Sequence, residues 1–267
     1  MLSAEERSRY ARQLSLPGFG AQGQERLREG RVLVVGCGGL GSAALAYLAA
    51  AGVGRIGFVD SDLVEVSNLQ RQVLHSTADI GRLKTASAEG RLRALNPHVH
   101  LEGYSLRLST DNARAVFAPY DIVLDACDNY ATKFLINDVC CAMRKPFVHA
   151  GLGGWCGQLM TVVPGRTACL RCVAPGADAE AEDEAEPTAG GVRSGPMGVV
   201  PGVLGALEAG EAVKYLTGQG ELMAGRLLLY DALAGTFETI RAAPAAECRA
   251  CAHLFAGAEN MQKERRQ

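Results

Sequence analysis

The 267-residue chain lacks a long apolar run, a strong charge of one sign and an internal repeat, and each absence excludes a class of protein. No stretch approaches the roughly 20 apolar residues of a membrane-spanning helix, and the polar residues after Met1 contain no apolar signal core. The net charge of −2 provides no broadly basic surface for nucleic acid. We therefore expect a cytoplasmic protein that uses neither membrane nor nucleic acid as a partner.

Cysteine, by contrast, is abundant, with nine residues in the chain. Disulfide frameworks belong mainly to short secreted chains, so we interpret these cysteines as metal ligands and buried thiols. Two Cys-x-x-Cys motifs stand out, Cys169 with Cys172 and Cys248 with Cys251. Two such pairs complete the tetrahedral four-sulfur site that structural Zn²⁺ prefers, so the motifs predict one Zn²⁺ that staples distant parts of the chain.

A glycine-rich loop follows the short apolar segment 31–35 and precedes an alanine-rich segment, 42–51, that we expect to be helical. A second apolar segment, 55–60, ends in Asp60, which completes a strand, helix, strand unit. In such a unit backbone N–H groups and a helix N-terminus can approach phosphates, and the acidic residue can hold ribose hydroxyls. The spacing alone fits NAD or FAD as well as ATP. The loop glycines that we expect to bind the cofactor are Gly36, Gly38, Gly39 and Gly41.

The rest of the chain continues the alternation of strands and helices. Strands are expected at 99–104, 121–126, 147–150, 158–163 and 226–230, and helices at 81–95 and 203–216. This predicts an α/β fold with a Rossmann-like, mainly parallel sheet, helices on both faces and a C-terminal extension stapled by zinc. The expected division is a helical lead-in over 1–30, a nucleotide-binding core over 31–165, a zinc-stapled part over 166–253 with a mobile loop at 176–195, and a disordered tail over 254–267.

Polar and charged residues concentrate after Asp60, where a bound adenosine would end. Arg71 could pair with a triphosphate, Lys84 adds a second cation, and Asp128 offers a carboxylate at the end of a strand. A Mg²⁺ ion on ATP phosphates typically takes one or two such carboxylates. The further residues expected at the cofactor are Asp62, Ser67, Asn68, Leu69, Gln70, Gln72 and Asn129.

Taken together, these motifs resemble the ThiF/MoeB/HesA family, relatives of ubiquitin-activating enzymes. The resemblance rests on the glycine loop, both cysteine pairs and the matching residues Arg9-Tyr10-Ala11-Arg12-Gln13, Asp60, Ser67 to Gln72, Lys84 and Asp125 to Asn129. It implies that Gly39, Asp60, Asn68, Arg71, Lys84 and Asp128 contact ATP or its Mg²⁺. It also implies a homodimer in which Arg12 reaches the phosphates of the neighbouring subunit.

The same resemblance implies a reaction, the adenylation of the C-terminal glycine of a small ubiquitin-like sulfur carrier ending in Gly-Gly. The carrier would serve thiamine or molybdopterin synthesis and bind the 166–253 part. Its carboxylate attacks the α-phosphate of ATP, so the enzyme needs alignment and charge neutralisation by Arg71, Lys84, Arg12 and a metal rather than its own nucleophile.

The chain departs from the family in the expected mobile loop. Many members carry a cysteine there that takes part in sulfur transfer, whereas the aligned position is Gly191 and no cysteine lies between Cys172 and Cys248. We therefore expect adenylation without a covalent step in this loop, and a separate sulfur donor protein, either a desulfurase or a rhodanese.

Three alternatives remain at this stage: a tRNA threonylcarbamoyladenosine dehydratase-like enzyme, a nicotinamide dehydrogenase, and a non-catalytic scaffold that binds a ubiquitin-like protein. The segment 68–72 and the cysteine pairs disfavour the dehydrogenase. We expect His149 to be a hydrogen-bonded core residue. The remaining cysteines, which we expect to be buried thiols, are Cys37, Cys127, Cys140, Cys141 and Cys156.

Overall fold

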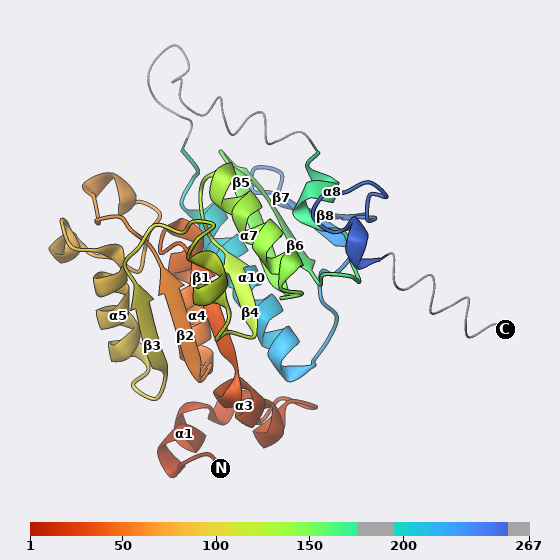
Figure 1. The fold of residues 1–267 in the computed structure, drawn as a ribbon. Helices are drawn as coiled ribbons and strands as arrows, with labels where there is room; N and C mark the ends of the chain where they lie inside the picture. Colours follow the sequence, from red (N-terminus) through yellow and green to blue (C-terminus); the bar gives the residue numbers. More distant parts are fainter. Residues whose placement is uncertain (176–194, 256–267) are drawn as a thin grey trace.

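A computed structural model describes residues 1–175 and 195–255 (Figure 1). The predicted mobile loop, apart from Gly195, and the predicted tail, apart from its first two residues, lie outside these ranges. Within them no helix is long and apolar enough to cross a membrane. The elements follow in the order α1 (Ala4–Arg9), α2 (Ala11–Leu14), α3 (Gly20–Glu29), β1 (Arg31–Val35), α4 (Gly39–Ala51), β2 (Arg55–Val59), η1 (Val66–Asn68), η2 (Thr77–Asp79), α5 (Lys84–Leu95), β3 (His100–Tyr104), α6 (Ala113–Phe117), β4 (Ile122–Asp125), α7 (Tyr130–Ala142), β5 (Phe147–Gly153), β6 (Cys156–Val162), α8 (Leu170–Val173), α10 (Val199–Thr217), β7 (Arg226–Asp231), β8 (Thr236–Arg241) and η3 (Ala252–Leu254).

The strands form one sheet in the order β3-β2-β1-β4-β5-β6-β7-β8. The strands from β3 to β5 in this order are parallel, and β6, β7 and β8 continue the sheet in antiparallel pairing. This confirms the predicted Rossmann-like, mainly parallel sheet. Helices α6, α7 and α8 and strand β8 were not expected from the sequence. Every residue of β8 is exposed, so the strand has no buried face to produce an alternating pattern.

Helices cover both faces of the sheet, as predicted (Figure 1). On one face α10 packs against α4, which packs against α5, and on the other α7 packs against α6 and α8. The central strands alternate between these layers. In β1, Val32 and Val34 belong to the core beneath α4 and α10, whereas Leu33 and Val35 belong to the core that contains the cysteine pairs. Both faces are buried, which explains the continuous apolar run of β1.

The glycine loop holds the start of α4 very close to two strand ends. Gly36 has a φ of 104°, and a Cβ there would lie 2.5 Å from the carbonyl oxygen of Ala126. A Cβ at Gly41 would lie 1.9 Å from the carbonyl oxygen of Gly36. Only glycine fits at these two positions. This close approach lets the first turn of α4 lie between the ends of β1 and β4. The helix therefore begins at Gly39, three residues before the expected Ser42.

The N-terminal helices lie at the opposite end of α4 from the glycine loop. Gln13 and Gln24 both donate hydrogen bonds to the carbonyl oxygen of Ala51, the last residue of α4, at 3.1 and 2.9 Å. A helix as long as α4 spans about 20 Å at 1.5 Å per residue. Arg12, next to Gln13, therefore lies at the far end of the sheet from the glycine loop of its own chain.

Candidate nucleotide site and cysteine cluster

The first turn of α4 is built to receive an anion. No side chain caps this helix, whose N-cap is Gly38. The unpaired N–H groups of a helix start and the positive end of its dipole favour a phosphate. The absence of side chains at Gly38 and Gly39 leaves the backbone open to a close approach, which is the chemistry that a nucleotide loop needs.

The Asp60 carboxylate, at the carboxyl end of β2, is oriented by two backbone amides. Oδ2 accepts a hydrogen bond from Cys37 N at 2.8 Å, and Oδ1 accepts one from Asp62 N at 2.9 Å. His75 holds the same loop from beneath, because its Nε2 lies 2.9 Å from the carbonyl oxygen of Cys37 and its Nδ1 lies 2.8 Å from Ser87 Oγ. Burial lowers the pKa of His75, so its neutral ring donates to that carbonyl through Nε2–H. The loop is thereby fixed before any ligand binds.

The polar segment after Asp60 brings Arg71 and Gln72 to the glycine loop. A Cβ built at Gly39 would lie 3.6 Å from Arg71 Cγ, and one at Gly38 would lie 3.7 Å from Gln72 Nε2. Arg71 Nη1 donates to the carbonyl oxygen of Ser67 at 3.1 Å. The structure therefore places the aliphatic stem of the Arg71 side chain against the first turn of α4.

Two other predicted residues of this region have partners within the chain. Lys84 is buried apart from 7% of its surface, and its Nζ lies 2.8 Å from the exposed Asp62 carboxylate. The Asn68 side chain accepts a hydrogen bond from Glu65 N at 3.1 Å. Lys84 thus carries a carboxylate partner that phosphate oxygens could replace.

Asp128 lies in the exposed turn that follows β4. Its carboxylate has no hydrogen-bond or ion-pair partner among the described residues. Asn129 caps α7, because its Oδ1 accepts a hydrogen bond from Thr132 N at 2.9 Å. β4 pairs in parallel with β1, so this turn adjoins the glycine loop, and a free carboxylate there suits a divalent cation bound to phosphates. The contacts described above bring Asp60, Asp62, Arg71, Gln72 and Lys84 to the glycine loop or to one another. Arg12 lies far from this loop in its own chain.

Sequence reasoning missed a buried ionic network directly behind Asp128. Asp125 is completely buried at the end of β4. Its Oδ1 accepts hydrogen bonds from Lys133 Nζ at 3.2 Å and the Cys127 thiol at 2.7 Å, and its Oδ2 accepts one from His149 Nδ1 at 2.7 Å. Burial opposes ionisation of Asp125, but the Lys133 charge and the His149 hydrogen bond lower the pKa of this carboxyl to about 2.

Two groups beside this network have no hydrogen-bond partner. His149 Nε2 and both carboxylate oxygens of the buried Glu208 are unpaired among the described residues. Burial, followed by the negative charge of Asp125, raises the pKa of Glu208 well above its usual range. The sequence did contain a signal for this buried network, because charged residues stand inside otherwise apolar strands and helices.

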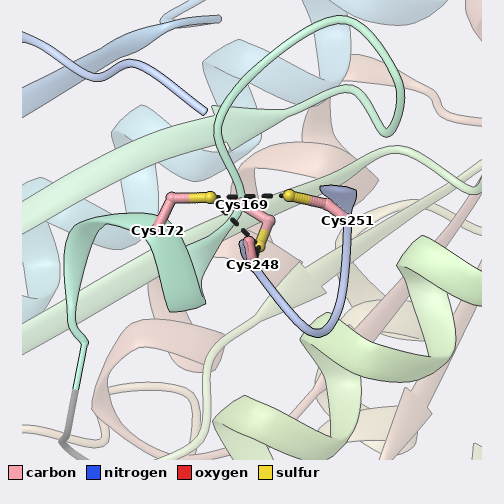
Figure 2. Close-up of side chains that lie close together, drawn as sticks. All are labelled: Cys169, Cys172, Cys248 and Cys251. Atoms are coloured by element: carbon pink, nitrogen blue, oxygen red, sulfur yellow. Dashed lines mark hydrogen bonds between the residues drawn. The ribbon is translucent and has the colours of Figure 1, made fainter. Parts of the chain in front are cut away.

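The four cysteines of the two motifs converge beside α8 (Figure 2). Their sulfur atoms all lie within 4.8 Å of one another, although Cys169 and Cys248 are 79 residues apart. The sulfur separations are 3.5 Å for Cys169 and Cys248, 3.4 Å for Cys172 and Cys251, and 3.8 Å for Cys169 and Cys172. A tetrahedron with Zn–S bonds of about 2.3 Å has edges of about 3.8 Å, so the cluster could hold a metal ion of this kind.

The remaining cysteines do not all follow the expectation of buried thiols. Cys37, Cys140 and Cys141 are buried, and Cys127 is half-buried with its thiol hydrogen-bonded to Asp125. Burial raises the pKa of the Cys37 and Cys127 thiols, which makes both poor nucleophiles. The expectation is wrong for Cys156, which is exposed. This residue is the first of β6 and lies next to the tight turn that joins β5 and β6.

These features define a class, the α/β proteins that bind a nucleotide at a glycine loop and carry a cluster of four cysteines able to hold a metal ion. The comparison with known families gives the particular member of this class. A family model described as the ThiF family matches residues 10–250, so the chain belongs to the ThiF family. The resemblance inferred from the motifs is confirmed.

Individual relatives extend the match over nearly the whole chain. The chain is 44% identical over 269 residues to the sulfur carrier protein adenylyltransferase of Thermus thermophilus, covering 97% of this chain and 94% of that protein. It is 43% identical over 250 residues to the SAMP-activating enzyme E1 of Haloferax volcanii, covering 94% and 90%. The adenylyltransferase and sulfurtransferase MOCS3 of Sus scrofa is 46% identical over 253 residues, but the match covers 94% of this chain and 54% of that protein.

The fold is also shared with solved structures of lower identity. E. coli MccB matches 94% of this chain and 75% of its own with a TM-score of 0.79. The sequence identity is 23%, so this likeness shows the fold alone.

Proposed function

We propose that the chain adenylates the C-terminal glycine of a ubiquitin-like sulfur carrier protein, using ATP and releasing pyrophosphate. One observation carries this function: Arg71 lies against the first turn of α4, and the unpartnered Asp128 carboxylate lies at the adjoining strand end. The Thermus thermophilus relative, matched along most of its length, is named a sulfur carrier protein adenylyltransferase. The dehydratase and scaffold alternatives are therefore not favoured.

The chain's own residues supply binding and charge rather than a nucleophile. The amides of Gly38 and Gly39 and the side chains of Arg71 and Lys84 receive the phosphates, while Asp60 holds the ribose. The carrier carboxylate attacks the α-phosphorus, and the bond to pyrophosphate breaks. Fixed positive groups stabilise the charge that develops on the phosphate oxygens, which is how a site without a covalent step accelerates this transfer.

Asp128 is the residue that would hold Mg²⁺, since a free carboxylate suits this hard cation. Bound Mg²⁺ would neutralise phosphate charge. The thiols of Cys169, Cys172, Cys248 and Cys251 would hold Zn²⁺, whose role is structural because four sulfur ligands leave no open position for a substrate.

The remaining positive charge at the nucleotide site comes from the second subunit of a homodimer. Arg12 is exposed and lies at the far end of α4 from its own glycine loop. We therefore assign it to the nucleotide site of the neighbouring subunit, as the family resemblance implies. The sulfur donor is a separate protein, because none of the described cysteines combines exposure with a place at the glycine loop.

An exposed apolar surface beside the nucleotide site fits the carrier. We name it the Trp155 patch, formed by Trp155, Met197, Leu233 and Phe237. Two backbone hydrogen bonds bring the segments that carry Trp155, Met197 and Leu233 together, from Met197 N to Gly154 O at 3.0 Å and from Ala232 N to Trp155 O at 2.9 Å. The next residue, Gly198, packs against the carbonyl oxygen of Gln70. A carrier seated on this patch could extend its C-terminus to Arg71.

The test is carrier-dependent exchange of labelled pyrophosphate into ATP. We expect exchange with an intact carrier and none with the same carrier lacking its terminal glycine. Leu233→Asp should raise the KM for the carrier but not for ATP, whereas Leu95→Asp, a substitution of an exposed leucine away from the patch, should change neither. Exchange that is absent with all candidate carriers would refute the proposed function.

A further inference from the structure

The ionic network behind Asp128 spans both ends of the turn that carries this residue. Asp125 ends β4 immediately before the turn, and Lys133 lies in the first turn of α7 immediately after it. Lys133 N donates to the carbonyl oxygen of Asn129 at 3.2 Å, and Lys133 Nζ donates to the carbonyl oxygen of Ala150 in β5 at 2.7 Å. One ammonium group therefore fixes α7 to β4 and β5 together.

Stability alone gives little reason for such a network. Removing two charges from water carries a desolvation penalty that their attraction often only offsets, and apolar residues of the same size are often equally stable. Here the penalty is larger, because His149 Nε2 and the Glu208 carboxyl are buried and have no hydrogen-bond partner in the described part of the chain. What an ion pair provides and an apolar pair does not is a fixed direction and distance between β4 and α7.

We propose that Lys133 and Asp125 are positioning residues that hold the turn so that Asp128 meets the metal bound to ATP. This inference rests on the proposed function, because it assumes that Asp128 serves a Mg²⁺–ATP site. Loss of the Lys133–Asp125 pair should act through Asp128, because the turn that carries Asp128 becomes more mobile. Mg²⁺ should then enhance ATP binding less effectively. Binding through Arg71 and the glycine loop should persist.

The experiment measures ATP binding by calorimetry across a series of Mg²⁺ concentrations, without carrier, so that no turnover occurs. Lys133→Met should raise the Mg²⁺ concentration for half-maximal enhancement of ATP affinity by at least about 10-fold, as outer-shell substitutions at metal sites commonly do. In an Asp128→Ala background the same substitution should add nothing further to the Mg²⁺ dependence. Non-additivity of this kind identifies a residue that acts through another.

A matched control is Lys145→Met, which removes an ammonium just beyond the other end of α7 that donates to the carbonyl oxygen of Tyr120. It should lower the melting temperature without moving the Mg²⁺ requirement. If Lys133→Met fails to fold, the double variant Asp125→Asn/Lys133→Met, which leaves no unpaired buried charge, should give the same Mg²⁺ shift.

The outcomes separate this inference from the proposed function. Wild-type protein that binds no ATP refutes the proposed function, and the positioning role with it. Wild-type binding that depends on Mg²⁺ and on Asp128, combined with an unchanged Mg²⁺ requirement in the folded Lys133 variants, overturns the positioning role alone.

Discussion

The nucleotide site and the cysteine cluster differ in how their reactive groups are partnered. At the glycine loop, Asp128 is exposed and has no partner among the described residues, and Lys84 has only a solvent-exposed carboxylate. In the cluster, three of the four cysteines are buried and all four sulfurs face one another. Charged groups that lack strong partners in the folded chain suit a ligand that binds reversibly. Buried thiolates that face one another suit a tightly bound structural metal ion. Substitutions should therefore affect activity in the first region and stability in the second.

The strongest test of this contrast is Asp128→Ala, which should reduce carrier-dependent pyrophosphate exchange by roughly 10²- to 10³-fold, as loss of one charge-stabilising group commonly does. Because the residue is exposed, the free energy of unfolding should change by no more than about 0.5 kcal/mol. Asp111→Ala, at another exposed aspartate, is the control and should leave exchange normal. Near-normal exchange in the Asp128 variant rejects this site.

Arg12 extends the contrast to an exposed residue whose side chain has no partner among the described residues and which lies far from the glycine loop of its own chain. Arg12→Ala and Asp128→Ala homodimers should each be nearly inactive. After equal mixing and subunit exchange, about one quarter of all sites should be intact, since half of the dimers are mixed and each holds one complete site. Exchange activity measured before and after mixing checks this. Activity that stays at the parental background would show that Arg12 does not act across the dimer.

The cysteine cluster should show the opposite behaviour. Elemental analysis should find about one zinc per chain, and Cys248→Ser should lower the free energy of unfolding by several kcal/mol, roughly 3 or more, because metal binding contributes to folding. The ATP dissociation constant of the folded fraction should stay within about twofold of wild type. Cys156→Ser, at an exposed thiol outside the cluster, is the control. Protein purified without chelator and found free of zinc would contradict this assignment.

Glu208, in α10, is a buried acid that belongs to neither region, and its carboxyl group has no hydrogen-bond partner among the described residues. Because its pKa is raised by burial, the folded chain keeps a proton that the unfolded chain releases above about pH 4.5. Stability from this group is therefore complete below that pH and declines as the pH rises toward the folded-state pKa. Because glutamine does not ionise, Glu208→Gln should become progressively more stable relative to wild type as the pH rises above about 4.5. Denaturant unfolding at several pH values measures this, with the exposed Glu221→Gln as control, and parallel curves would show that Glu208 is ionised when folded.

The smallest expected effect concerns covalent chemistry. With glycine at position 191 and Cys127 buried against Asp125, no reductant-sensitive conjugate with the carrier should form on non-reducing gels with ATP. Cys156→Ser should leave exchange unchanged. A stoichiometric conjugate mapped to Cys156 would show instead that this exposed thiol is the nucleophile.

Local patterns were sufficient to predict most of the fold. The run at 31–35 followed by glycines predicts a buried strand and a phosphate loop, since both depend on neighbouring residues alone. The strand β8 was missed because it is exposed along its whole length. The start of α4 was placed three residues late because helical glycines are unusual, and here the close approach of Gly41 to Gly36 requires them.

The polar network could not be predicted in the same way. Asp125, Lys133 and His149 belong to three different elements, and only the tertiary fold shows that they share one carboxylate. A charge within an apolar segment indicates that a partner exists, but it does not identify the partner. The residues expected at the nucleotide could be named from the sequence because the glycine loop, Asp60 and the segment 67–72 form local motifs, and the family resemblance supplied the roles of Lys84, Asp128 and Arg12.

We propose that this chain activates a carrier carboxylate through the charged side chains around its glycine loop. Mass spectrometry of a sulfur carrier incubated with the enzyme, ATP and Mg²⁺ tests it most directly, with the Asp128→Ala enzyme in parallel. We expect an adenylyl group on the C-terminal glycine with wild-type enzyme and almost none with the variant. A carrier that stays unmodified while the wild-type enzyme demonstrably binds both ATP and the carrier would contradict it.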